Sequence, residues 1–232
     1  MKISLGARLL AEFLGTAFLL MVIVGSGIMG ERLSGGNTAI ALLANSLATG
    51  CGLYVLISAL MPVSGAHLNP VVTLTEALSG RMPWGDAASY VAAQFFGAYA
   101  GVAAANIMFE LPTFFLSRRE RSGTGVWFSE FVATFGLIAV IQLCGLFQPR
   151  SIPAAVAAYI TAAYWFTAST SFANPAVTLG RSASNTFAGI RLADAPGFVA
   201  AQLLGALAAT ALLYRARRAA TPDATSASAR NA

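Results

Sequence analysis

Two short segments of this sequence nearly repeat each other. They are Ala66 to Leu74, with the letters AHLNPVVTL, and Ser171 to Leu179, with the letters SFANPAVTL. In each segment an Asn stands directly before a Pro. This pair is typical of a helix N-terminus, because Asn caps the helix and Pro takes the first helical position, where no N–H is needed. Each segment is therefore predicted to begin a helix.

The surroundings of these two helix starts are unusually hydrophobic. Of the 232 residues, 57% are hydrophobic and 10% are charged, whereas soluble domains average roughly 25% charged residues. This balance predicts a protein that crosses the lipid bilayer several times. The net charge of +5 comes from Lys and Arg at the chain ends and in connecting segments. Without a basic stripe or interleaved aromatic residues, a nucleic-acid partner is not expected.

Apolar windows long enough to cross about 30 Å of hydrocarbon, about 20 residues each, occur six times. These predicted spans are Ala7 to Met29, Thr38 to Leu60, Trp84 to Phe109, Val126 to Phe147, Ile152 to Thr170 and Pro196 to Tyr214.

The two Asn-Pro segments lie between the second and third spans and between the fifth and sixth. Helices over 69–79 and 174–184 would each be about 16 Å long at 1.5 Å per residue, or half a bilayer. Two such helices that enter from opposite faces meet at the midplane. Irregular backbone at that depth requires burial in protein or a water-filled cavity.

The spans repeat as well. Gln94 in the third span and Gln202 in the sixth lie in matching segments, as do Glu12 in the first and Glu130 in the fourth. Each half thus has three spans and one half-helix, and an odd number of spans makes the repeat inverted. We predict an all-α membrane protein with six transmembrane helices and two re-entrant half-helices. Residues 1–218 form one channel domain with halves of about 7–109 and 126–214, and residues 219–232 are expected to be a disordered tail.

The N-terminal segment is predicted to be a retained span, because Glu12 interrupts the apolar run that a cleaved signal peptide would need. The distribution of Lys and Arg between the connecting segments weakly favours a cytoplasmic location for both termini. The expected location is the cell (inner) membrane.

Several polar side chains are candidates for function. Asn69 and Asn174 would donate hydrogen bonds to a solute oxygen, while the two half-helix N-termini oppose the passage of cations. Glu12 and Glu130 are predicted to accept hydrogen bonds from the re-entrant loops, and a proton relay is the alternative. His67 is expected to brace its loop, with a pH gate as the alternative.

Enzymatic chemistry is not expected. The sequence has one His, no pair of nucleophile and base, and no spacing typical of a metal site or cofactor. Cys51 and Cys144 lie in apolar segments, and buried packing is expected for both.

The two motifs Asn69-Pro70-Val71 and Asn174-Pro175-Ala176, in an inverted repeat with the paired Glu and Gln residues, resemble the aquaporin and aquaglyceroporin family. The resemblance covers nearly all of residues 7–215. It implies a six-helix channel subunit, assembled as a homotetramer, that conducts water or small neutral solutes passively.

One position departs from the family pattern. Most members carry an Arg directly after the second motif, where this sequence has Val177. Alignment by the offsets from the two Asn residues completes the predicted selectivity filter with Thr49, Ala162 and Ser171. A ring of these residues is wider and less polar than a ring of Phe, His and Arg. In lacking both the aromatic residue and the Arg, this filter resembles that of the bacterial aquaglyceroporins of arsenic-resistance operons. Arsenite, methylated arsenicals, glycerol and urea are the candidate solutes.

The sequence also allows a prediction for Arg181 and an alternative function. Arg181 lies one helical turn beyond Val177, and we expect it to face solvent or lipid headgroups near the membrane surface. A secondary transporter is the alternative function, because inverted repeats with broken helices also build transporters.

Overall fold

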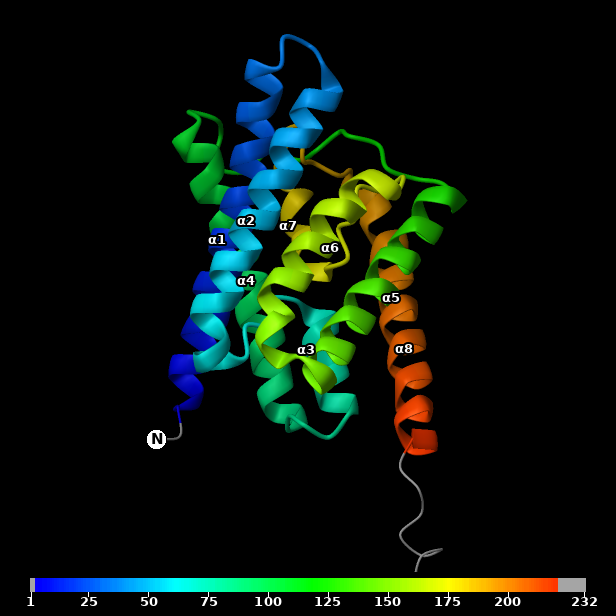
Figure 1. Ribbon diagram of the computed structural model, residues 1–232. Coiled ribbons are helices and arrows are strands. Elements are labelled where there is room, and N and C mark those ends of the chain that lie inside the picture. Colours follow the sequence, from blue (N-terminus) through cyan, green and yellow to red (C-terminus); the bar gives the residue numbers. More distant parts are fainter. Residues whose placement is uncertain (1–2, 221–232) are drawn as a thin grey trace, which may run out of the picture.

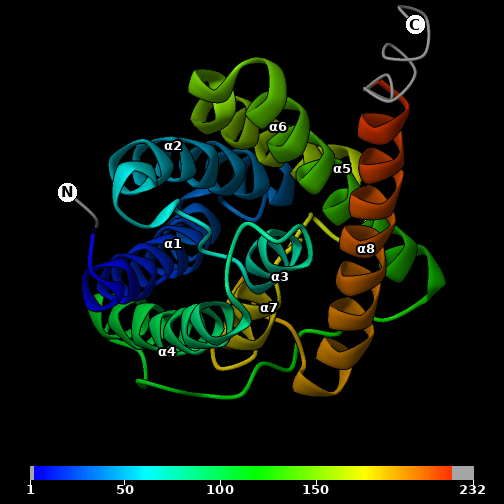
Figure 2. The ribbon, with the colours of Figure 1, turned by 90° about the horizontal axis from the view of Figure 1, so that it is seen from below.

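The computed structural model describes residues 3–220 and shows a bundle of helices around two short central ones (Figures 1 and 2). The long helices of the first half are α1 (Leu5–Leu33), α2 (Thr38–Ser64) and α4 (Trp84–Met108), with the short α3 (Pro70–Leu78) between α2 and α4. The second half contains α5 (Thr124–Phe147), α6 (Ile152–Phe166), the short α7 (Pro175–Arg181) and α8 (Ala195–Ala220), and the 3₁₀ turns η1 (Pro149–Ser151) and η2 (Leu192–Asp194).

The order of the second four helices repeats that of the first four with reversed direction. In Figure 1, α1 and α4 run upward and α2 downward, whereas α5 and α8 run downward and α6 upward. As a result, α1 begins and α8 ends at the same end of the bundle, which we call the termini end. The inverted repeat predicted from the sequence is confirmed. The predicted tail, residues 219–232, lies outside the described residues except for its first two, which are the last residues of α8.

One predicted span is shorter than expected. Within residues 3–220, five helices are long and apolar enough to cross a membrane. The sixth, α6, has 15 residues and ends at Phe166, where Thr170 was predicted. The chain becomes extended at Thr167 (φ −112°, ψ 139°), because the following residues already turn back toward the centre of the bundle.

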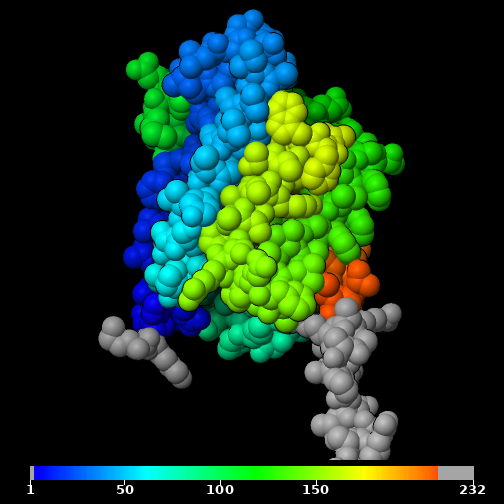
Figure 3. Space-filling view, in the orientation of Figure 1, coloured from blue at the N-terminus to red at the C-terminus, as the bar shows by residue number. Residues whose placement is uncertain are grey.

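The outer surface is apolar. Large exposed side chains cover the bundle on its outer faces, among them Phe18, Phe96, Phe128, Phe147 and Leu204. Figure 3 shows one such face, where α6 lies between α2 and α5. Cys51 is exposed and Cys144 partly so, so the expectation that both are buried was wrong for Cys51.

Glycines allow the closest helix contacts. A Cβ atom added at Gly101 would lie 2.1 Å from the Ala17 carbonyl oxygen, and one at Gly97 would lie 2.3 Å from that of Phe13. The equivalent contact in the second half joins Gly205 to the Phe131 carbonyl at 2.4 Å. Small residues therefore set the separation of α4 from α1 and of α8 from α5, as is common in membrane helix pairs.

We expect Gly101→Ala to lower the free energy of unfolding by about 1–3 kcal/mol, because the added methyl group meets backbone that has no room to move. Gly85→Ala, on the same helix, is the matched control, since a Cβ there meets nothing within 4 Å. Thermal unfolding of both variants in one detergent measures the difference. Equal transition temperatures would contradict the proposed role of Gly101.

Candidate functional site

The two half-helices begin side by side at the centre of the bundle. Asn69 and Asn174 are both in extended conformation (φ −159°) and each caps the helix that starts with the next residue, a Pro. The Asn69 Oδ1 accepts a hydrogen bond from the Val71 N–H at 3.0 Å, and the Asn174 Oδ1 accepts from Ala176 and Val177 at 2.9 and 3.2 Å. The caps thus fix the direction of both carboxamides.

The amide nitrogens of the two caps bind across the repeat. Asn69 Nδ2 donates to the Ala173 carbonyl and Asn174 Nδ2 donates to the Leu68 carbonyl, both at 2.8 Å. A carboxamide nitrogen carries two hydrogens, and these bonds use one of them in each Asn. The second hydrogen of each remains for a solute, and both Asn residues line the central cavity.

The loops before the caps have an unusual backbone. Ala66 and Leu68 have φ of 49°, and Ser171 and Ala173 have φ of 49° and 48°. Residues other than Gly rarely adopt this left-handed region, and each instance costs on the order of 1–3 kcal/mol unless the surroundings impose it. Both loops line the cavity. Within residues 3–220, the carbonyls of Ala66, His67, Ser171 and Phe172 accept no hydrogen bond.

Two buried carboxylates impose this backbone. Glu12 accepts hydrogen bonds from the His67 and Leu68 N–H groups at 2.9 and 2.7 Å, and also from Ser64 and Gln94. Glu12 and Glu130, its equivalent in the second half, are both 0% exposed. Because all these donors belong to the loop or to its supports, Glu12 orients one re-entrant loop.

The second half repeats the arrangement. Glu130 accepts from the Phe172 and Ala173 N–H groups, both at 2.9 Å, and from Gln202 at 2.6 Å. Each Gln also donates to a half-helix Thr, Gln94 to Thr73 and Gln202 to Thr178, both at 2.9 Å. Each loop is thus supported by its own set of the same three groups, which are a Glu carboxylate, a Gln amide and a Thr hydroxyl.

His67 breaks the symmetry. Its ring Nδ1 lies 3.0 Å from Thr73 Oγ1, its ring packs 5.3 Å from that of Tyr90, and it lines the cavity. The equivalent residue of the second half is Phe172, which has no polar ring atom. These contacts tie His67 to α3 and α4.

One cavity of about 260 Å³ passes both Asn residues. Its walls on α2 and α6 consist of residues spaced by four, which place one stripe of each helix toward the lumen. These stripes are Thr49, Leu53, Ile57 and Met61 on α2, and Ile152, Val156, Ile160 and Tyr164 on α6. The half-helices contribute Val72, Glu76, Val177 and Arg181.

Three of the four predicted filter residues line this cavity, namely Thr49, Ser171 and Val177. Ala162 is exposed on the outside of α6 and does not line it, so its assignment is corrected. The stripe of four-residue steps reaches Tyr164, whose hydroxyl lies 3.2 Å from Thr49 Oγ1. An offset that ignores the helical period placed the filter two residues away, on the opposite side of α6.

The expectation that Arg181 faces solvent or lipid headgroups was also wrong. Its side chain is 2% exposed, and its guanidinium lies 3.4 Å from the centroid of the Phe172 ring. Its Nε donates to the Ala188 carbonyl. The chain after α7 folds over the helix end, where residue 115 pairs with residue 184 in an isolated β-bridge. Arg181 therefore ends inside protein instead of in solvent or headgroups.

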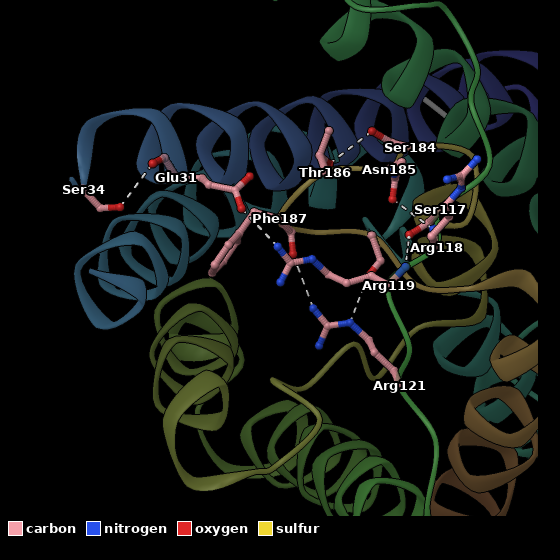
Figure 4. A network of polar contacts seen from close by, with 11 residues as sticks. Glu31, Ser34, Ser117, Arg118, Arg119, Arg121, Ser184, Asn185, Thr186 and Phe187 are labelled. Atoms are coloured by element: carbon pink, nitrogen blue, oxygen red, sulfur yellow. Dashed lines mark hydrogen bonds and ion pairs between the residues drawn. The ribbon is translucent and has the colours of Figure 1, made fainter. Parts of the chain in front are cut away.

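A charged loop covers the end of the bundle opposite the termini. Arg121 donates to the carbonyls of Gly189 and Ser169. Figure 4 shows that it also donates to the Phe187 carbonyl and that Arg119 pairs with Glu31, at 3.0 Å. Burial, with a smaller contribution from Arg119, lowers the pKa of Arg121 to about 10. This pKa is still well above neutral, so Arg121 keeps its positive charge.

Comparisons with known proteins agree with this geometry. The family model described as "Major intrinsic protein" matches residues 1–150 and 147–232. The chain is 54% identical over 212 residues to "Aquaglyceroporin AqpS" of Rhizobium meliloti (strain 1021), with 91% of each chain covered. It is 30% identical to "Aquaglyceroporin-3" of Trypanosoma brucei brucei over 62% of this chain and 52% of that one.

A solved structure shows the same fold. The "X-ray structure of the aquaglyceroporin from Plasmodium falciparum" superposes with a TM-score of 0.71 at 20% identity, over 89% of this chain and 94% of the other. Six membrane helices, two re-entrant half-helices and a central cavity define a transmembrane channel. The chain belongs to the major intrinsic protein family and is a passive channel for small uncharged solutes.

We expect Glu12→Gln to destabilise the channel and reduce its flux. A Gln side chain offers one carbonyl oxygen and turns an NH₂ group toward buried donors, and each unmet donor costs about 1–3 kcal/mol. Glu110→Gln is the control, since this exposed side chain makes no hydrogen bond or ion pair within residues 3–220. The measurements are thermal unfolding in detergent and stopped-flow solute uptake. A Glu12→Gln variant with unaltered stability and flux would contradict the role assigned to the carboxylate.

Proposed function

We propose that this channel conducts glycerol-sized uncharged solutes as well as water, and that arsenite and methylated arsenicals belong to its solute class. The observation that carries the proposal is the lining of the cavity. Apolar stripes of α2 and α6 face a polar track made by the two Asn carboxamides and the loop carbonyls.

A small polyol matches both sides of such a passage. Its hydroxyl groups exchange hydrogen bonds with the track, while its carbon atoms contact residues such as Leu53, Ile57 and Ile160. Pockets in proteins combine apolar walls with a few placed polar groups in the same way. Arsenous acid, which is neutral and bears several hydroxyl groups, offers the same hydrogen-bonding pattern.

The filter is proposed to consist of Thr49, Tyr164, Ser171 and Val177. Val177 is short and apolar where the family resemblance places an Arg. The Ser171 hydroxyl is buried without a partner within residues 3–220, and Ser171 lines the cavity beside Val177. The name of the 54% identical relative, an aquaglyceroporin, supports this solute class.

The setting is proposed to be the cell (inner) membrane, with both termini cytoplasmic and four copies forming a homotetramer. Support for a shared side comes from α1 and α8, which respectively begin and end at the termini end (Figure 1). With that orientation, the loop of Arg119 and Arg121 covers the outer mouth. The remaining apolar faces of the bundle would contact lipid and neighbouring copies.

The test is solute uptake by proteoliposomes against gradients of glycerol, urea, arsenite and water, with and without a proton or sodium gradient. We expect downhill glycerol flux that is indifferent to both ion gradients. Flux that requires one of them would instead support the transporter alternative.

Val177→Arg should lower glycerol flux by about tenfold or more, because a long side chain there narrows the passage beside Thr49 and Tyr164. Val177→Leu is the uncharged control and should have a smaller effect. Unaltered passage of every solute through Val177→Arg, in a variant that inserts normally, would show that the filter lies elsewhere.

A further inference from the structure

The second half-helix places two side chains in the cavity, Val177 and, one turn later, Arg181. The equivalent residues of the first half-helix are Val72 and Glu76, seven residues after Asn69 as Arg181 is after Asn174. Glu76 forms a bidentate ion pair with Arg81, with distances of 2.7 and 2.6 Å. Arg181 makes no ion pair within residues 3–220.

Burial of the unpaired Arg181 guanidinium costs free energy, so the contacts of this group show what stabilises it. The Nε atom donates to the Ala188 carbonyl, and the planar group stacks on Phe172 at 3.4 Å. The two terminal nitrogens donate no hydrogen bond to any described residue, and the side chain lines the cavity. These terminal N–H groups are therefore turned to whatever occupies the passage.

The contact with Phe172 also shows how far Arg181 reaches. Side chains on a helix tilt toward its N-terminus, and Phe172 precedes the first residue of α7 by three positions. The guanidinium thus extends back from the last turn of the half-helix toward the filter. Arg121 adds a second cation, 5.1 Å from the centroid of the same ring.

We infer that Arg181 supplies the cationic element of the outer filter that position 177 lacks. Its charge, reinforced by Arg121, opposes the entry of metal cations and protons, and its terminal nitrogens donate hydrogen bonds to a solute oxygen. The inference rests on the proposed function and specifies its selectivity. With the charge on a neighbouring turn, position 177 stays small, so the passage admits larger neutral solutes and still excludes cations.

The experiment measures K⁺ leak and proton leak through proteoliposomes, with glycerol uptake recorded on the same preparations. Wild-type protein is expected to leak no more than protein-free vesicles. Arg181→Gln should raise the cation leak by about tenfold or more, and a measurable glycerol uptake, lower or higher than that of wild type, shows that the variant forms a pore. Arg181→Lys should keep the leak at the wild-type level, because the charge is retained.

Arg118→Gln is the matched control. Arg118 is an exposed residue of the covering loop, its backbone N–H rather than its side chain binds Asn185, and its removal changes the net charge equally. Its leak should equal that of wild type. The double variant Val177→Arg with Arg181→Gln, which returns the cation to position 177, should lower the leak again.

An Arg181→Gln channel that takes up glycerol and leaks no more cations than wild type would overturn the inference and leave the proposed function intact. Absence of glycerol uptake by the wild type would instead overturn the proposed function. If Arg181→Gln does not assemble, wild type and Arg181→Lys decide the matter. A cation leak above protein-free vesicles in either one contradicts the inference.

Discussion

The buried carboxylates of Glu12 and Glu130 hold the backbone from which the channel is built. Each lies on the first helix of its half and accepts N–H groups from the re-entrant loop that follows the next helix of the chain. The loops contain left-handed residues other than Gly, a conformation that persists only when its surroundings impose it. Because the carboxylates take up the N–H groups on one side, the carbonyls are left for the passage on the other.

Much of this arrangement is predictable from the sequence, for a physical reason. A buried carboxylate in a membrane span is expensive and needs donors, and a half-bilayer helix that starts with Asn-Pro brings exposed donors with it. Because each half of the sequence contains one such carboxylate and one such helix start, the repeat predicts that each carboxylate binds the loop of its own half. The matching positions of Gln94 and Gln202 identify two further polar residues of the repeat. In the structure their amide groups donate hydrogen bonds to Glu12 and Glu130.

The errors have a different origin. Ala162 was assigned by counting residues across a loop, and such counting does not determine which side of α6 faces the lumen. The four-residue steps from Ile152 to Tyr164 carry that information and were available in the sequence. The burial of Arg181 was not available in this way, because it depends on the segments around residues 115 and 188 that fold over the end of α7. These contacts are made by irregular loops, which have no periodic pattern.

The reciprocal bonds from Asn69 to Ala173 and from Asn174 to Leu68 have a consequence for regulation. A shift of one half-helix along the membrane normal must either break both bonds or drag the other half-helix with it. The midpoint of the passage is thereby locked as a single unit shared by both repeats. We therefore expect any opening and closing of this channel to occur away from that midpoint, where single side chains and the covering loop can move without breaking the two bonds.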